Sequence, residues 1–135
     1  DVFFQLAEAC DMILFDVKCA DPLLHKKHTG TDNKTIISNL LSLNKLKTVI
    51  MIRIPLIGGF NDTLSEMQAI AGLLKEVRTG IAGISLLPNH GMGVAKYQRM
   101  GLTIPDLLTS KPPEDFIKEA EAFFSQSGFN VKIGG

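Results

Sequence analysis

The chain of 135 residues carries 14 basic and 14 acidic side chains, so its formal net charge is zero, and 45% of its residues are hydrophobic. This composition is typical of a globular domain that buries a core. Because no run of Lys or Arg stands out, nothing supports binding to nucleic acid or to a membrane surface through a basic patch. No apolar run approaches the roughly 18 residues that cross a bilayer, and we see no charged and then apolar leader. A cytoplasmic location is therefore expected.

The first part of the chain predicts two strands with helices around them. Residues 1–9 have the pattern of the last turns of a helix, and residues 12–18 (MILFDVK) form an unalternating strand of the kind covered on both faces. Asp21-Pro22 begins a short helix that Gly30 ends. A second helix is expected over about residues 33–46, where apolar residues recur at helical spacing. A strand over about residues 48–55 follows.

The second part of the chain repeats this alternation. Thr63 to Glu66 has the pattern of a capping box and begins a helix whose buried face runs to Val77. A strand is expected over about residues 83–87, and a long loop over residues 88–111. A helix then begins at Pro112-Pro113-Glu114, and the chain closes with a short strand over residues 129–133 (FNVKI).

Strands and helices therefore alternate along the whole chain, which predicts an α/β fold with a parallel sheet and right-handed crossovers. Two architectures fit this order. One is a small doubly wound sheet. The other is part of a (β/α) barrel, which takes about 250 residues when complete. Periodicity does not separate the two.

Charged and polar residues follow the carboxyl ends of the predicted strands, where ligands bind in either architecture. Asp16 and Lys18 end the first strand two positions apart, so they share a face; Arg53 interrupts the second strand, and His90 follows the third. Lys and Arg can hold a carboxylate, Asp can bind an amine or a cation, and His can donate a hydrogen bond or lie against a flat ring. Each residue alone could equally be structural, for example as an ion pair. Together they favour a ligand site.

Other candidate residues favour structural roles. A strand separates Cys10 from Cys19, which puts them too far apart for a disulfide, so both are expected to be ordinary thiols. His25 and His28 lie three residues apart, but with no third ligand in sight a solvated helix face is favoured over a metal site. Gly58-Gly59 favours a simple turn, and Asp62 a loop or cap group.

Several motifs occur in one order along the chain. They are DMILFDVKCADPLLHKKHTG, IRIPLIGGFNDT, SLLPNHGMGVAKYQRMG, KPPEDF and the terminal VKIGG. This series, over about residues 11–135, resembles the C-terminal half of the glycyl-radical-enzyme activating enzymes. These belong to the radical S-adenosylmethionine (SAM) superfamily, and the pyruvate formate-lyase activating enzyme is the best-known member.

The resemblance implies a partial (β/α)6 TIM-like barrel, of which residues 1–135 would form the C-terminal half as a single domain. It also implies a four-iron four-sulfur cluster and SAM bound across the barrel mouth. In the family, an electron from the cluster cleaves SAM, and the resulting 5′-deoxyadenosyl radical takes a hydrogen atom from a glycine of the partner enzyme. The partners implied are therefore a glycyl-radical enzyme and a flavodoxin or ferredoxin as electron donor.

The resemblance also assigns roles to individual residues. Lys18 is similar to the family lysine that contacts the methionine carboxylate of SAM, and Asp16 to the aspartate at a monovalent-cation site beside it. Arg53 resembles the arginine that faces SAM and the incoming glycine loop, and His90 the histidine that contacts SAM. Leu87 falls where the family packs an aliphatic side chain near the adenine.

The chain departs from the family pattern in three places. Gly58-Gly59 replaces a frequent Pro-Gly pair, and Asn89 replaces a frequent Tyr. No C-x-x-x-C-x-x-C occurs, so the thiolates that would hold the cluster are missing. We therefore expect these residues to be part of a longer protein and to be inactive alone, with a first strand whose uncovered edge invites association. The alternative is a stand-alone binding module of receiver type.

Overall fold

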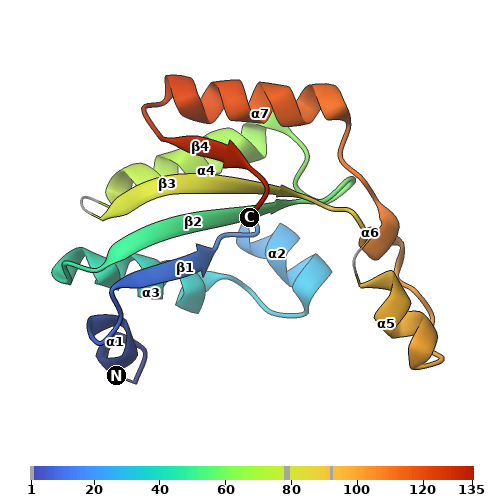
Figure 1. Ribbon diagram of the computed structural model, residues 1–135, viewed down its shortest axis with the longest axis horizontal. Helices are drawn as coiled ribbons and strands as arrows, with labels where there is room; N and C mark the ends of the chain where they lie inside the picture. Colours follow the sequence, from blue (N-terminus) through green and yellow to red (C-terminus); the bar gives the residue numbers. More distant parts are fainter. Residues whose placement is uncertain (1, 78–79, 92) are drawn as a thin grey trace.

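The computed structural model describes residues 2–77, 80–91 and 93–135. Their strands form one sheet in the order β1-β2-β3-β4, and every neighbouring pair is parallel (Figure 1). The strands are β1 (Met12–Asp16), β2 (Val49–Leu56), β3 (Ile81–Pro88) and β4 (Val131–Ile133). The predicted parallel α/β sheet is confirmed.

Helices alternate with the strands as expected. The helices of the described residues are α1 (Val2–Glu8), α2 (Pro22–Thr29), α3 (Lys34–Ser42), the 3-10 turn η1 (Leu43–Lys45), α4 (Leu64–Glu76), α5 (Val94–Arg99), α6 (Asp106–Thr109) and α7 (Glu114–Gln126). Of these, α5 and α6 were not expected. The helix predicted over 33–46 thus ends as a 3-10 turn. Asp1, included in the first predicted helix, lies outside the described residues.

Local capping chemistry fixes where two of the helices begin. Asp21 Oδ1 accepts hydrogen bonds from the backbone N–H groups of Leu23 and Leu24 at 2.7 and 2.9 Å, which satisfies the first turn of α2. Gly30 ends α2 in the left-handed conformation, with φ of 86°. Thr63 Oγ1 accepts from Glu66 N at 3.3 Å at the start of α4. All three predicted helix boundaries are confirmed.

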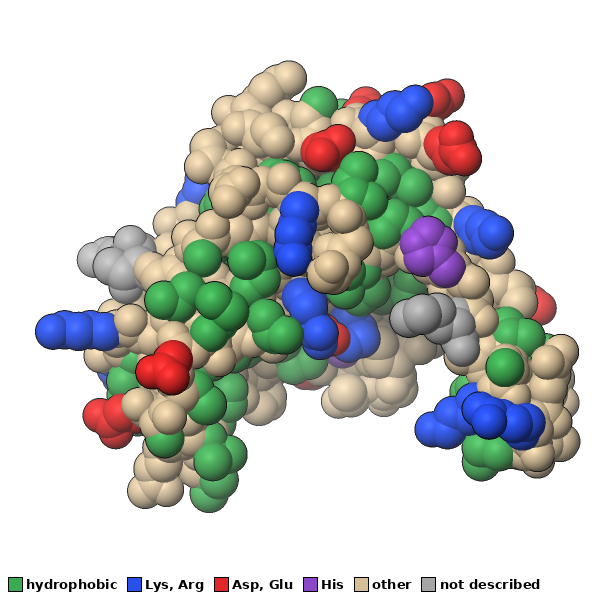
Figure 2. All heavy atoms as spheres, in the orientation of Figure 1, with side chains coloured by type: hydrophobic (Ala, Val, Ile, Leu, Met, Phe, Trp, Pro, Cys, Tyr) green, Lys and Arg blue, Asp and Glu red, His purple; other side chains and the backbone are tan. Residues whose placement is uncertain are grey.

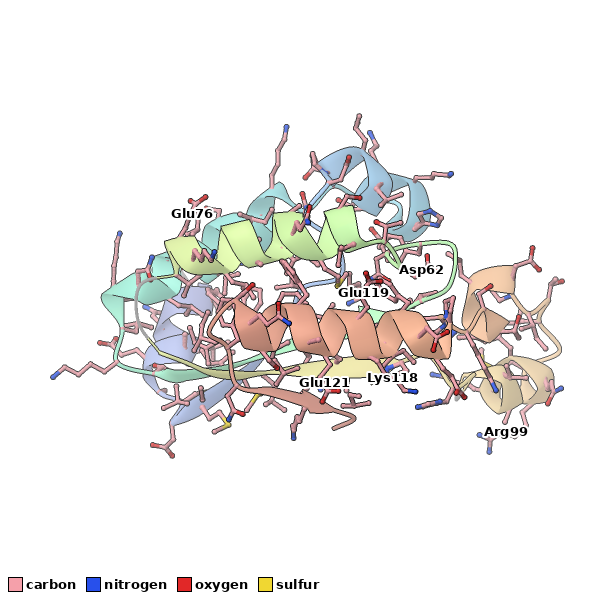
Figure 3. The ribbon with its side chains drawn as sticks, turned by 90° about the horizontal axis from the view of Figure 1, so that it is seen from above. Asp62, Glu76, Arg99, Lys118, Glu119 and Glu121 are labelled. Carbon is pink, nitrogen blue, oxygen red and sulfur yellow. The ribbon has the colours of Figure 1, made fainter. Side chains whose placement is uncertain are left out.

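Among the described residues, helices cover one face of the sheet and leave the other without a helix (Figure 1). Alternate residues of the strands point to the covered face, and the central ones, Ile52, Ile54, Ile84 and Leu86, are fully buried. They pack against apolar side chains of the covering helices, which include Leu40, Leu43, Met67, Ile70, Leu74, Phe116, Ala120 and Phe124. In Figure 3, α4 and α7 lie side by side over the sheet, with the labelled Lys118, Glu119 and Glu121 on α7.

This arrangement decides between the two architectures that the sequence left open. A doubly wound sheet, including a receiver-type module, has helices on both faces and a strand order that reverses at a switch point. Here the strands follow one another in chain order, and within the part of the chain that the structure describes one face carries no helix (Figure 1). The fold is therefore a segment of a (β/α) barrel.

Two predictions about local structure were wrong. The stretch MILFDVK is not covered on both faces, since Phe15 is buried whereas Met12 and Leu14 are 52% and 55% exposed. The reason is that Met12 and Leu14 pair in register with Val49 and Met51 and point to the face of the sheet that carries no helix among the described residues. The predicted long loop over 88–111 contains α5 and α6, which lie beyond the carboxyl ends of the strands (Figure 1). These helices are short and have no buried residue, so they leave no apolar periodicity.

Within the described ranges, no helix has the length and apolar character needed to cross a membrane.

Candidate functional site

The uncovered face of the sheet, called the open face below, carries a row of polar residues. Asp16 pairs with Arg53, Arg53 with Ser85, and Ser85 with Lys132 across the four strands. Residues paired in register point to the same face, so this row crosses the open face. Figure 2 shows basic side chains near the centre of this face, with hydrophobic surface on either side.

Three of the predicted site residues form one connected group, the Asp16 cluster of Asp16, Lys18 and Arg53. Nε and Nη2 of Arg53 both lie 2.7 Å from Asp16 Oδ1, and Lys18 Nζ lies 3.4 Å from Asp16 Oδ2. The three side chains are 35 to 42% exposed, so water screens these ion pairs and they add little to stability. Arg53 and Lys18 both keep further N–H donors that an anion can use.

The backbone that carries Lys18 is tied to the next strand by a buried amide. Asn61 Nδ2 donates to Lys18 O at 2.7 Å and to Pro55 O at 2.6 Å, while Asn61 Oδ1 accepts from Ile57 N at 2.9 Å. Asn61 is fully buried. The ends of β1 and β2 are therefore held in a fixed relation, which sets the distance between Lys18 and Arg53.

Two more buried side chains hold the residues that follow Lys18. Asn33 Nδ2 donates to Cys19 O at 2.8 Å and to Ala20 O at 2.9 Å. The carboxylate of Glu66 accepts a hydrogen bond from Ala20 N. We call Asn33, Asn61 and Glu66 the loop-holding residues. The capping-box pattern predicts that Glu66 bonds to the start of its own helix. Its actual partner, Ala20, lies 46 residues earlier in the chain, and no local pattern indicates that contact.

Cys19 belongs to the same loop, and its side chain is a buried thiol. Its Sγ donates to Asp21 O at 3.1 Å, and the residue is 2% exposed. Burial, followed by the nearby Glu66 carboxylate, raises the pKa of this thiol to about 12. Cys10 is exposed, and neither cysteine is in a disulfide. The prediction of two unlinked thiols is confirmed.

The other two predicted site residues are placed differently. Leu87 pairs with Pro55 on the open face and is half-buried. His90 is exposed, two residues beyond the end of β3, and within the described part of the chain it makes no hydrogen bond or ion pair with the Asp16 cluster. The structure therefore brings three of the five residues into contact.

The histidines of α2 do not form the solvated face that was expected. His25 is buried, and its Nδ1 donates to Thr31 O at 2.7 Å. The ring of His28 lies against Phe60, with centroids 4.7 Å apart. Among the described residues, no three or more His, Cys, Asp or Glu side chains gather closely enough to hold a metal ion. A four-iron four-sulfur cluster held by the three thiolates of C-x-x-x-C-x-x-C does not fit a chain with two cysteines.

The loop predictions are confirmed in part. Gly59 has φ of 72°, which suits a turn, and Gly59 N donates to Asp62 Oδ1 at 2.9 Å, so Asp62 is a loop group. Gly58 has a further role, since a Cβ atom there would lie 2.5 Å from Lys111 O. Asn89 Nδ2 donates to the carbonyl oxygens of Leu107, Leu108 and Ser110 at 2.9 to 3.1 Å.

Two curated relatives are similar to this chain over almost its whole length. The chain is 36% identical over 133 residues to the trans-4-hydroxy-L-proline dehydratase activating enzyme of Clostridioides difficile, covering 97% of this chain and 43% of the relative. It is 36% identical over 135 residues to the choline trimethylamine-lyase activating enzyme of Oleidesulfovibrio alaskensis, covering 98% of this chain and 44% of the relative. The chain is homologous to the glycyl-radical-enzyme activating enzymes. No family model matches it.

Solved structures agree with the fold of an activating enzyme. A domain of a pyruvate-formate lyase-activating enzyme from Bacteroides vulgatus superposes with a TM-score of 0.80 at 23% identity, covering 98% of this chain and 73% of that one. A radical SAM methyltransferase from Sphaerobacter thermophilus superposes with a TM-score of 0.69 at 16% identity, covering 98% and 37%. At these identities the likeness shows the fold alone. The chain spans less than half the length of the curated relatives named above.

Proposed function

We propose that the protein containing this chain is a radical SAM activating enzyme that generates a glycyl radical on a partner enzyme. The observation that carries the proposal is the Asp16 cluster. It presents Lys18, just past the end of β1, and Arg53, in the C-terminal half of β2, side by side with donors left for an anion. This is the donor set that a carboxylate on a zwitterionic ligand requires.

Each residue of the site has a proposed task toward SAM. Lys18 binds the methionine carboxylate, and Asp16 orients Lys18 and Arg53 and offers a free lone pair of its carboxylate to a monovalent cation. Arg53 faces both SAM and the glycine loop of the partner. His90 contacts SAM from the loop after β3, and Leu87 packs near the adenine. The loop-holding residues keep the backbone of Lys18 in place, so that this segment does not have to be ordered when SAM binds.

SAM, when bound, supplies the radical chemistry, and a four-iron four-sulfur cluster supplies the electron. The two cysteines of this chain do not form a cluster site, so its ligands are proposed to lie in the rest of the protein. The partner is proposed to be a glycyl-radical enzyme and the electron donor a flavodoxin or ferredoxin, in the cytoplasm. The curated relatives named above activate a dehydratase and a lyase other than pyruvate formate-lyase. Pyruvate formate-lyase is therefore one candidate partner among several.

The proposal is tested on the full-length protein, reconstituted anaerobically with iron and sulfide and then reduced. We expect SAM to be converted to 5′-deoxyadenosine and methionine, and one enzyme of a panel to gain a glycyl-radical signal in electron paramagnetic resonance. The panel contains trans-4-hydroxy-L-proline dehydratase, choline trimethylamine-lyase and pyruvate formate-lyase. A reconstituted protein that neither binds nor cleaves SAM would contradict the proposal.

A further inference from the structure

Ser85 and Lys132 complete the polar row on the open face, yet the proposed SAM site does not use them. Ser85 lies between Arg53 and Lys132 in the register of β2, β3 and β4. Because adjacent strands lie about 4.8 Å apart, the backbones of Arg53 and Lys132 lie about 10 Å apart with the serine between them. Both residues have long side chains, so both can reach one ligand above Ser85. We call these three residues the Lys132 subsite.

The hydroxyl group of Ser85 has no partner in the fold. Ser85 is 2% exposed, and among the described residues its side chain makes no hydrogen bond. Its oxygen is nevertheless not sealed inside the protein, in contrast to His28 Nε2. A hydroxyl group that is so nearly buried and makes no hydrogen bond is unfavourable for folding. The position therefore suits a ligand on the open face that bonds to this hydroxyl group.

Unbalanced positive charge surrounds this hydroxyl group. Arg53 uses Nε and Nη2 for Asp16, and its Nη1 bonds to no described residue. Lys132 is exposed and, within the part of the chain that the structure describes, forms no ion pair. The row therefore contains two positive side chains and the single negative charge of Asp16. One positive charge stays without a counterion, even before Lys18 is counted.

We propose that the Lys132 subsite binds a carboxylate group other than that of SAM. A carboxylate balances the single positive charge, and it accepts hydrogen bonds from a guanidinium, an ammonium and a hydroxyl group at the same time. A phosphate dianion would bring more negative charge than the row can balance. The carboxylate can belong to a small molecule or to an acidic side chain of a polypeptide, since the subsite contacts this group alone. The inference rests on the proposed function for one point, the assignment of Lys18 to SAM.

Acetate is the probe for the subsite, and acetamide is its matched control because it has the same shape without the charge. The full-length protein, labelled at Leu and Met methyl groups, is titrated by NMR with SAM at saturation, so that the position at Lys18 is already filled. We expect shifts at Leu87 and Met51, which lie on the open face beside Ser85 and Arg53, and about tenfold tighter binding of acetate than of acetamide. Equal binding of the two probes, no shift at these methyl groups, or displacement of SAM by acetate would overturn the inference.

The source of the carboxylate is distinguished by the rate of glycyl-radical formation on the enzyme that responds in the panel. If the carboxylate is an acidic side chain of that enzyme, acetate should raise the KM for the enzyme in wild type and not in Lys132→Gln. If it belongs to a small molecule, acetate should leave this KM unchanged. A rise in KM that is equal in wild type and Lys132→Gln would count against the subsite.

Two variants make the binding test specific. Lys132→Gln should weaken acetate binding about tenfold through the lost charge, and Ser85→Ala about fivefold through one lost hydrogen bond. Lys118→Gln is the control, because Lys118 is exposed on α7, over the covered face of the sheet (Figure 3). SAM affinity in the same samples should stay within about twofold of wild type, which shows that each variant is folded. Failure of SAM to bind the wild type would refute the proposed function, whereas unchanged acetate binding in Lys132→Gln would refute this inference alone.

Discussion

The two faces of β2 have opposite characters, although their residues alternate along one strand. Ile50, Ile52 and Ile54 point to the helix-covered face and are fully buried. Met51 and Arg53 point to the open face and remain partly exposed. The covered face contains the core, whereas the open face contains the Asp16 cluster. One strand therefore supports the fold with every second residue and the proposed site with the others.

This contrast teaches that stability and ligand binding should respond to different substitutions. A change on the covered face removes packing and should lower the free energy of unfolding. A change in the Asp16 cluster removes only screened charge pairs and should act on SAM instead. The loop-holding residues are buried like the core but bond to the site, so they should affect both properties.

Ile52→Ala should give the largest loss of stability, about 2 to 5 kcal/mol, because it leaves a cavity between the sheet and the helices. Urea unfolding of the full-length protein, followed by circular dichroism, measures this. Met51→Ala is the matched control on the open face of the same strand, and we expect it to cost about 1 kcal/mol. Equal losses at the two positions would remove the distinction between the faces.

Asn61→Ala should cost about 2 to 3 kcal/mol, since it leaves the carbonyl groups of Lys18 and Pro55 and the N–H of Ile57 without their partner. It should also weaken SAM binding, because the backbone of Lys18 loses its tie to β2. The exposed Asn130→Ala serves as control for both measurements. A variant that loses stability but binds SAM normally would show that Asn61 is structural only.

The pKa of Cys19 predicts a smaller, pH-dependent effect. The pKa of the thiol is about 12 in the folded protein and about 9 in the unfolded chain. The contribution to stability is therefore complete below about pH 9 and is lost as the pH rises toward 12. Urea unfolding at intervals from pH 8 to 11 should show a decline that Cys19→Ala lacks. If the free energy of unfolding changes with pH in the same way in wild type and Cys19→Ala, the raised pKa of Cys19 would be contradicted.

Sequence reasoning worked where the cause is local. Asp21, Gly30 and Thr63 mark helix boundaries through bonds to residues close by in the chain, and all three were predicted. Asp16, Lys18 and Arg53 were brought together because parallel strands end at one edge of a sheet. The fold class followed from the alternation of elements.

What the sequence did not predict depends on distant contacts. Whether Met12 and Leu14 are covered depends on what packs against the open face of the sheet, which their own pattern does not contain. Glu66 pairs with Ala20 and Asn61 with Lys18 across more than 40 residues, so no short motif announces either contact. Association along the β1 edge stays a prediction, as do the roles of Leu87 and His90.

Lys18 is the central residue of the proposed site, and SAM binding to the full-length protein tests its role directly. Isothermal titration calorimetry should show about 10- to 100-fold weaker SAM binding in Lys18→Ala than in wild type, because charge-assisted hydrogen bonds to the carboxylate are lost. The free energy of unfolding should stay within about 0.5 kcal/mol of wild type. The exposed Lys47→Ala should alter neither quantity. Unchanged SAM affinity in Lys18→Ala would contradict the assignment of the site.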